Sequence, residues 1–411
     1  MDIILEQYMK KLFILLTFFI SSLYANILQE AINNAPINSI LKLPNGIYYG
    51  NIKINKPLTI IAKEKNVIIQ GENKDSVIEI TSSNVILKNL TIQGSGNRID
   101  ARDAGIKISN SNNSKIQNCT IKDSLYGIDM GMVTNSIIEN NYITSKDVEI
   151  SLRGNALKLY YSNDNIIRNN EIYNSKDIIF SYSHNNLITQ NHIEKLRFGL
   201  HFLKSNKNTI DNNHFAFNSV GLIFGGAKDT VVKNNMIKSS IGKAGIGVLI
   251  KGVSNFVFKN NTVTFNNKAF YIDAKHNETT IKRFITNNEI SYNMEALHFH
   301  GAIKQNLIKK NKILGNIDDV VKSVRGNSTS KNIVEENYWD HYSGFDRNND
   351  NIGDTTYRIV QYADRLWHYN NKVKFFYATP IISILNFILS LAPFIEPVVL
   401  LEDTKPIVQI K

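Results

Sequence analysis

Short alternations of apolar and polar residues, punctuated by asparagine, run along most of the chain. The element Asn-x-Ile/Val-x-x-Asn-x-Ile/Val recurs with small variations in length, and its second Asn falls at positions 141, 170, 191, 213, 235, 261, 288, 311 and 337. The smallest spacings are 21 residues, from 170 to 191, and 22 residues, from 191 to 213. Such a period suits one turn of a parallel β-solenoid, with three short strands and three bends. We therefore predict an all-β fold, a right-handed parallel β-helix of about eleven coils over residues 26–339.

The asparagine column is expected to be structural. Stacked Asn side chains at a bend can bond one another and the backbone of adjacent coils, and Asn tolerates the left-handed conformation that a tight bend needs. Leu90 and Cys119 occupy the same slot in two earlier coils. We expect Cys119, the only cysteine, to replace a ladder Asn and to be buried. Residues 28–35 are predicted to form a helix that caps the open N-terminal edge.

A small residue followed by alternation marks another strand in each coil, as in 199–203 and 296–300. If Leu200 and Phe202 point inward, the period of two turns the intervening residues outward. The predicted outward column contains Asp129, Lys158, Ile179, His201, Ile223, Leu249, Tyr271 and His298. The apolar members Ile223, Leu249 and Tyr271 indicate a partner-binding surface. The alternative is that the C-terminal segment folds back over them.

Histidine and methionine on these columns are candidate copper ligands. The residue after the ladder Asn is Glu171, His192, His214 and Met236 in four consecutive coils. Stacking would place His192, His214 and Met236 on one strip, and these side chains suit Cu(I). The alternative is a solvated strip. His201, His298 and His300 form a second candidate group on the apolar face, with surface hydrogen bonding as the alternative.

Two different segments follow the repeat. In 340–374, Asp346, Asn348, Asp350 and Asp354 resemble the oxygen spacing of a calcium loop, but Asn351 stands where an EF-hand has its turn glycine. An Asx-rich turn is the alternative.

The second segment, 375–411, contains a predicted apolar helix over 380–392. Such a helix is too short to cross a bilayer, so we expect it to dock on a membrane protein or to lie in the interface. The expected contacts are Phe375, Phe376, Ile384, Phe387 and Leu391.

Composition and the N-terminal segment indicate the compartment in which the protein is expected to work. The chain has 411 residues, 43% of them hydrophobic, and a net charge of +11, which favours anionic partners. Lys10 and Lys11 precede an apolar run over 12–20 and small residues up to Ala25, which predicts an export signal over 1–25. Met9 is an alternative start that would place both lysines at the N-terminus. A lone cysteine cannot form an internal disulfide in the exported chain.

Several longer motifs together resemble the NosD family. They are the stretches 154–162 (GNALKLYYS), 197–202 (RFGLHF), 337–340 (NYWD), 353–358 (GDTTYR) and 363–366 (ADRL), followed by the hydrophobic tail. The resemblance implies a periplasmic, non-enzymatic maturation factor for the copper–sulfur site of nitrous oxide reductase. It also implies an ABC transporter permease with its ATPase, a copper chaperone lipoprotein and the reductase as partners, with transient copper contact. Membrane association would then run through the permease, and nucleic acid is not an expected partner.

The main rival is an exported polysaccharide lyase, hydrolase or epimerase, because many parallel β-helices act on acidic sugars. Such enzymes need clustered carboxylates, or an acid, a base and an arginine in one groove. Acids on the predicted outer face, such as Asp129 and Asp273, are several coils apart. A purely structural surface protein is the third class. Turnover of a uronic-acid polymer would favour the enzyme, and co-purification with a permease would favour the maturation factor.

Overall fold

The computed structural model describes residues 27–64, 66–273, 282–323, 329–361, 376, 379–391 and 398–410. The predicted signal peptide and Phe375 lie outside this part of the chain. The chain divides into two compact units, unit 1 (Met1–Leu196) and unit 2 (Arg197–Lys411). The predicted all-β parallel solenoid is confirmed, with about twelve turns in the two units together. Among the described residues, no helix has the length and apolar character to cross a membrane.

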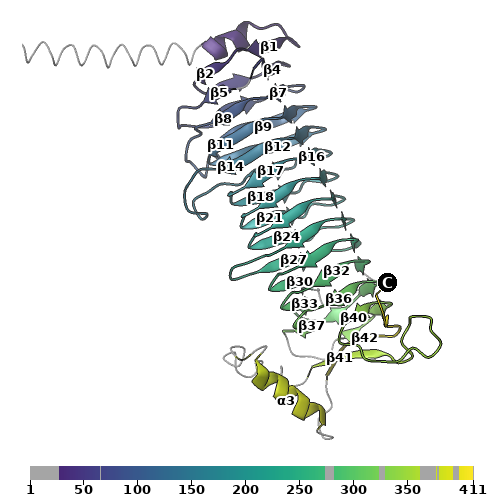
Figure 1. Ribbon diagram of the computed structural model, residues 1–411. Helices are drawn as coiled ribbons and strands as arrows, with labels where there is room; N and C mark the ends of the chain where they lie inside the picture. The colour runs from purple at the N-terminus through teal and green to yellow at the C-terminus, as the bar shows by residue number, and fades with distance from the viewer. Residues whose placement is uncertain are drawn as a thin grey trace, which may run out of the picture. The chain divides into compact units, whose positions relative to one another are not determined.

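Unit 1 consists of three parallel sheets whose strands stack coil on coil (Figure 1). The first sheet contains β1 (Ile40–Leu43), β4 (Thr59–Ala62), β7 (Ile86–Lys88), β10 (Lys115–Gln117), β13 (Ile137–Glu139), β16 (Ile166–Arg168) and β19 (Leu187–Thr189). The second contains β2 (Gly46–Tyr49), β5 (Val67–Gln70), β8 (Thr91–Gln93), β11 (Thr120–Ser124), β14 (Tyr142–Ser145), β17 (Glu171–Tyr173) and β20 (His192–Glu194). The third contains β3 (Ile52–Ile54), β6 (Ile78–Ile80), β9 (Ala104–Asn112), β12 (Tyr126–Thr134), β15 (Leu157–Tyr160) and β18 (Asp177–Ser181).

Unit 2 repeats this plan. Its first sheet contains β22 (Thr209–Asp211), β25 (Val231–Lys233), β28 (Phe256–Lys259), β31 (Arg283–Thr286), β35 (Asn306–Lys309) and β39 (Ile333–Glu335). The second contains β23 (His214–Ala216), β26 (Met236–Lys238), β29 (Thr262–Thr264), β32 (Glu289–Ser291), β36 (Lys312–Leu314) and β40 (Tyr338–Trp339). The third contains β21 (Phe198–Leu203), β24 (Val220–Gly225), β27 (Ile246–Lys251), β30 (Lys268–Asp273), β33 (Glu295–Phe299) and β37 (Asp318–Lys322).

Three smaller elements complete unit 2. They are the parallel pair β34 (Ile303–Lys304) and β38 (Thr329–Ser330), the antiparallel pair β41 (Tyr357–Gln361) and β42 (Val398–Asp403), and the helix α3 (Pro380–Leu391). Strands β41 and β42 pack against β37, and β42 also packs against β39. The last part of the predicted docking tail therefore forms a cap on the final coils, whereas α3 is a separate element.

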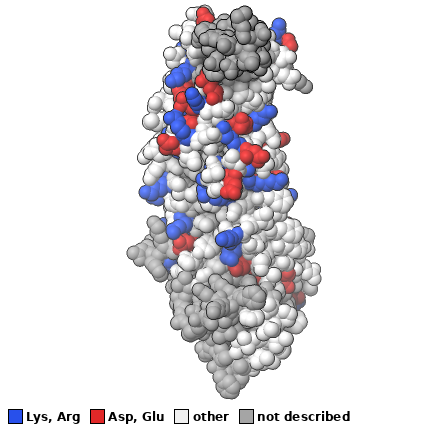
Figure 2. Space-filling view, turned by 90° about the vertical axis from the view of Figure 1, so that its left-hand side faces the viewer, with Lys and Arg blue, Asp and Glu red and all other residues white. Residues whose placement is uncertain are grey.

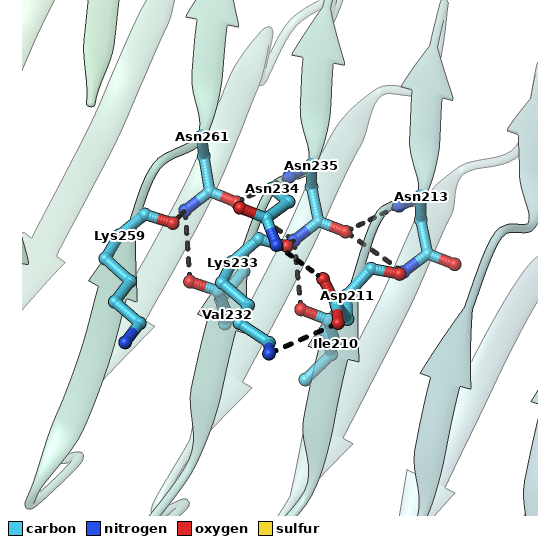
Figure 3. A network of polar contacts seen from close by, with 9 residues as sticks. All are labelled: Ile210, Asp211, Asn213, Val232, Lys233, Asn234, Asn235, Lys259 and Asn261. Carbon is cyan, nitrogen blue, oxygen red and sulfur yellow. Dashed lines mark hydrogen bonds and ion pairs between the residues drawn. The ribbon is translucent and has the colours of Figure 1, made fainter. Parts of the chain in front are cut away.

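The predicted asparagine ladder is present in both units. In unit 1, Asn141 donates from Nδ2 to Asn170 Oδ1 at 3.0 Å, and Asn170 donates in the same way to Asn191 at 2.9 Å. In unit 2 the same bond joins Asn213 to Asn235, and Asn235 to Asn261 (Figure 3). The side chains of Asn141, Asn170, Asn235 and Asn261 also each donate to a backbone carbonyl of the preceding coil. The ladder thus satisfies buried amides that the bend would leave without partners.

The left-handed conformation lies one residue earlier than the ladder position. Asn140 has φ 56° and Asn234 has φ 56°, each immediately before a ladder Asn. The residues before the other seven ladder positions also have positive φ; they are Asn169, Gln190, Asn212, Asn260, Asn287, Lys310 and Glu336. The two consecutive asparagines in many repeats therefore have separate roles. The first tolerates the strained backbone and the second forms the ladder.

The interior is filled by the inward residues of all three sheets. Leu200 and Phe202 are buried, as the alternation predicts. A small residue stands before these inward positions because the next coil is close. At Gly221, the equivalent position one coil later, a Cβ would lie 2.6 Å from the carbonyl oxygen of Gly247. In unit 2 the core contains packed phenylalanines, with Phe202 and Phe224 stacked at 5.2 Å between ring centroids.

The predicted N-terminal cap is confirmed as a helix over 27–34. Leu28 and Ile32 are buried against the first coil. Gln29 pairs with the backbone of Lys53 on β3, donating to its carbonyl at 3.1 Å and accepting from its N–H at 2.7 Å. The side chain therefore replaces the missing neighbour at this point of an otherwise open strand edge.

Candidate functional site

The predicted outward column is present on the third sheet. In unit 1, Asp129 is in register with Lys158, and Lys158 with Ile179. In unit 2 the register runs from His201 through the four residues Ile223, Leu249, Tyr271 and His298. This outer face of β21, β24, β27, β30, β33 and β37 is called the outer histidine face below.

Apolar side chains on the outer histidine face cover one another. Val220, Ile223 and Ile246 form a buried cluster, and the side chains of Leu249 and Tyr271 pack against it. Ile223 is 8% exposed. The described C-terminal strands pack on β37 and β39. A partner-binding role for Ile223, Leu249 and Tyr271 stays a prediction.

His298 lies at the centre of a polar network on this face. Its Nδ1 forms a short contact with Glu295 Oε2, and its Nε2 lies 2.5 Å from the Ser323 hydroxyl. Lys268 donates to the other oxygen of Glu295 at 3.1 Å. Burial raises the pKa of Glu295, but the hydrogen bond from His298 and the charge of Lys268 outweigh this effect and hold that pKa below its ordinary value.

His300 differs from His298 in exposure. His298 is 5% exposed, whereas His300 is on the surface. The Tyr271 ring stacks with both imidazoles, at centroid distances of 5.0 Å to His298 and 5.7 Å to His300. The two predicted ligands are therefore brought together beside one aromatic ring. His201, the third, lies on β21 next to Phe198, with a centroid distance of 5.5 Å.

The other predicted copper strip lies on the second sheet. His192 in unit 1 is in register with Glu171, and its Nε2 lies 2.7 Å from Glu194 Oε1. His214 in unit 2 is in register with Met236, which is exposed and is followed in the column by Thr262. Within each unit, the residues of this strip therefore follow one another from coil to coil in the order that the sequence predicts. Copper contact on this strip stays a prediction.

The proposed calcium loop has the hydrogen bonds of an Asx-rich turn. Asp346 accepts from the backbone N–H groups of Asp350 at 3.2 Å and Asn351 at 2.8 Å, and Asp354 accepts from that of Arg347 at 3.0 Å. Asn348 donates from Nδ2 to Asp350 Oδ2 at 3.0 Å. These oxygens accept hydrogen bonds within the loop, and calcium binding by these residues is not supported.

Helix α3 carries an apolar surface. Ile384, Phe387 and Leu391, predicted as contacts, are 58%, 64% and 67% exposed, and Phe376 is 45% exposed. Ile381 and Ile388 add to the same exposed set, while Ile382 is buried. Exposed large apolar side chains at this density are typical of a surface that meets another protein or a lipid interface.

Two polar groups were not predicted from the sequence. One is the Glu295–His298–Ser323 network. The other joins Asp319 on β37 to Asp340 and His341, which follow β40. The hydrogen bond to Asp319, with the charge of both aspartates, raises the pKa of His341 to about 9, and burial raises the pKa of Asp319. The strand register pairs Lys268 with Glu295, so the repeat pattern could have predicted their contact. Ser323 and His341 lie outside the strands, where the register gives no information.

The charge on the face shown in Figure 2 is mixed. Basic and acidic side chains alternate over its upper part rather than forming a field of one sign. Ion pairs also join opposite charges within unit 1: Arg102 lies 2.9 Å from Asp129, and Arg168 lies 2.5 Å from Glu139. The net positive charge of the chain is therefore not gathered into one basic patch on this face.

These features define a class: a parallel β-solenoid, capped at the first coil by a helix and at the last by the antiparallel strand pair β41–β42, with an exposed apolar helix near its C-terminus. The sequence profile described as "Periplasmic copper-binding protein (NosD)" matches residues 139–344 of the chain. That match covers 206 of the 411 residues. The chain belongs to the NosD family, whose members are described as periplasmic.

Two curated relatives support the assignment over most of the chain. A probable ABC transporter binding protein NosD of Stutzerimonas stutzeri is 23% identical over 388 residues, covering 86% of this chain and 84% of the relative. A protein of the same description from Pseudomonas aeruginosa is 21% identical over 367 residues, covering 86% and 85%.

Solved structures with similar folds come from other functional classes. The A-module of the Azotobacter vinelandii mannuronan C-5 epimerase AlgE4 matches with a TM-score of 0.58 at 15% identity, covering 72% of this chain and 94% of the module. The Dettilon tailspike protein matches with a TM-score of 0.52 at 13% identity, covering 74% and 64%. At these identities the likeness concerns the fold alone.

Proposed function

We propose that this chain is the periplasmic subunit of an ABC transporter complex that serves assembly of the copper–sulfur site of nitrous oxide reductase. In this role the chain is not an enzyme. It binds the transporter permease through its C-terminal helix and receives the copper chaperone lipoprotein and the reductase on its sides. Family membership supports the transporter association and the periplasmic location, because both curated relatives are described as probable ABC transporter binding proteins.

The exposed apolar surface of α3 is the observation that carries the transporter part of the proposal. The helix has 12 residues, so its length is about 18 Å. A bilayer core is about 30 Å thick, which is too wide for it to cross. Ile384 and Phe387 instead form an apolar surface of the size that a membrane-protein partner can cover. Burial of two such side chains would contribute about 3–6 kcal/mol before the cost of association.

Copper contact is proposed at His298 and His300. Ligating histidines commonly donate their second ring N–H to a carboxylate, and Glu295 holds Nδ1 of His298 in this way. The other nitrogen of His298 faces the Ser323 hydroxyl, a weak partner that Cu(I) could displace. Exposed His300 lies beside the same Tyr271 ring. A pair of imidazoles suits a Cu(I) ion that is passed on as cargo better than it suits a copper ion held permanently in a closed site.

Co-purification tests the transporter part. The full chain is co-expressed with the permease and ATPase and isolated in detergent, as wild type and as the double variant Ile384→Glu, Phe387→Glu. We expect the double variant to lose the permease, because it places two charges in an apolar contact. The matched control is Leu152→Glu, which adds a charge at a residue 57% exposed, close to the 58% of Ile384. Equal recovery of the permease with all three proteins would contradict the proposal.

A cellular assay tests the maturation part. In cells that lack this chain, we expect the reductase polypeptide to accumulate without its copper–sulfur site, as measured by its copper content and nitrous oxide reduction. Wild type and Leu152→Glu should restore both, whereas the α3 double variant should not. His300→Ala should reduce copper loading while the permease still co-purifies. Turnover of a uronic-acid polymer by the purified chain would favour the polysaccharide-enzyme alternative instead.

A further inference from the structure

Three potential metal ligands converge at the last coil of unit 2. His341 Nδ1 lies 3.0 Å from Asp319 Oδ2 and 3.4 Å from Asp340 Oδ1. One donor atom from each residue lies within 4.8 Å of the other two. Asp319 comes from β37, whereas Asp340 and His341 follow β40, so the group joins two neighbouring coils.

The spacing of these donor atoms fits a coordination shell. Zinc binds imidazole nitrogen and carboxylate oxygen at about 2.0–2.2 Å. Two ligands at that distance are separated by about 3.0 Å at right angles and about 3.4 Å at the tetrahedral angle. The separations of 3.0 Å and 3.4 Å from His341 Nδ1 to the two carboxylates match these values.

Asp319 provides an independent observation that points to a ligand. Its side chain is 3% exposed. Its Oδ1 makes no hydrogen bond of ordinary geometry with the described residues, and the Tyr357 hydroxyl on β41 interacts with this carboxyl group without meeting that geometry. A buried carboxylate oxygen that is so poorly satisfied is costly, and a bound cation would remove that cost. Tyr357 also interacts by charge with Asp340.

The donor types select the class of ion. One imidazole and two carboxylates without sulfur suit borderline divalent ions such as Zn²⁺ rather than Cu(I), which prefers thiolate, thioether and imidazole. We propose that Asp319, Asp340 and His341 form a divalent transition-metal site of the Zn²⁺ type that fastens the last coil to the segment after it. Three protein ligands leave room for water in a fourth position. The site is distinct from the copper contact proposed at His298 and His300.

Zn²⁺ titration of the full mature chain, stripped of metal with a chelator, tests the site. Calorimetry should give one equivalent of bound Zn²⁺, and the unfolding temperature should rise with Zn²⁺ concentration because the ion binds only the folded state. Asp340→Asn and His341→Ala should each weaken binding about tenfold or more and remove the thermal shift. His184→Ala, at a histidine outside both proposed metal groups, is the matched control and should bind Zn²⁺ like wild type. His300→Ala, measured beside it, reports any ion bound on the outer histidine face.

The possible results separate the explanations. Binding that is lost in His300→Ala but kept in His341→Ala would place the ion on the outer histidine face and overturn the proposal. Absence of stoichiometric binding would overturn it as well. Asp340 is partly exposed, with 31% of its side-chain surface accessible, so Asp340→Asn keeps the test valid if an Asp319 variant fails to fold. The assay uses the isolated chain, so its outcome is independent of the transporter and copper proposals.

Discussion

Asp403 continues the asparagine ladder beyond Asn337, although the two residues are 66 positions apart in the sequence. Its Oδ2 accepts from Asn337 Nδ2 at 2.9 Å and from the Asn337 backbone N–H at 3.2 Å. These are the bonds that the next ladder Asn would make. The same oxygen accepts from Trp339 Nε1 at 2.9 Å. One fully buried carboxylate on β42 therefore closes the ladder and fastens the C-terminal strand pair to the last coil.

Asp403→Ala should destabilise the C-terminal cap. The change leaves three buried donors without their acceptor, so we expect the free energy of unfolding to fall by about 3 kcal/mol. Urea denaturation measures the total, and limited proteolysis should show earlier cleavage around β41 and β42. Asp403→Asn retains an acceptor oxygen and should lose less. Glu402→Ala is the control, because its ion pair with Arg358 is exposed. Equal effects of the changes at Asp403 and Glu402 would count against this account of the cap.

Asn235→Ala should test the ladder itself. Asn235 Oδ1 accepts from the backbone N–H and the Nδ2 of Asn213, and its own Nδ2 donates to Asn261 and to the Ile210 carbonyl. Removal leaves buried groups on two coils unsatisfied, so the free energy of unfolding should fall by about 1–3 kcal/mol in urea denaturation. Asn267→Ala, the same change at an exposed position, should stay within about 0.5 kcal/mol. A similar loss in both variants would show that the ladder bonds contribute little.

Cys119 should be unreactive in the folded chain. Its backbone N–H donates to Asn141 Oδ1 at 2.9 Å, which confirms its predicted place in the ladder, and burial raises the pKa of its thiol to about 12. Because the thiolate is the reactive form, alkylation at pH 9 should be about a hundredfold or more slower in the folded than in the unfolded chain.

The same shift in the pKa of Cys119 fixes the sign of the pH effect. Above pH 9 the unfolded chain loses a proton that the folded chain keeps, so this thiol makes stability fall as the pH rises from about 9 towards 12. Cys119→Ser should remove that part of the pH dependence. Rapid labelling of the folded wild type at pH 9 would contradict both expectations.

The sequence was sufficient to predict the repeating coils, but it was insufficient to predict contacts between segments that are far apart in the chain. Period, alternation and the second Asn of each repeat predicted the three sheets, the ladder and the place of Cys119, because stacking copies one residue's environment into the next coil. The role of Asn234, one residue before the ladder, requires the observed φ. The Asp403 contact and the Asp319–His341 pair depend on the path of the chain after its last repeat. That part of the sequence is not periodic, so the repeat pattern cannot predict its contacts.

His298 and His300 should respond differently to removal, although they are two residues apart. Both ring nitrogens of His298 are engaged, by Glu295 and by Ser323, and the side chain is buried. His298→Ala should therefore lower the free energy of unfolding by about 1–3 kcal/mol. His300→Ala removes an exposed ring and should change it by no more than about 0.5 kcal/mol. Urea denaturation without metal separates this structural effect from copper uptake, because His300→Ala should lose Cu(I) binding at unchanged stability. If His300→Ala proved as destabilising as His298→Ala, exposure would not distinguish the two residues, and the copper role assigned to His300 would lose its main support.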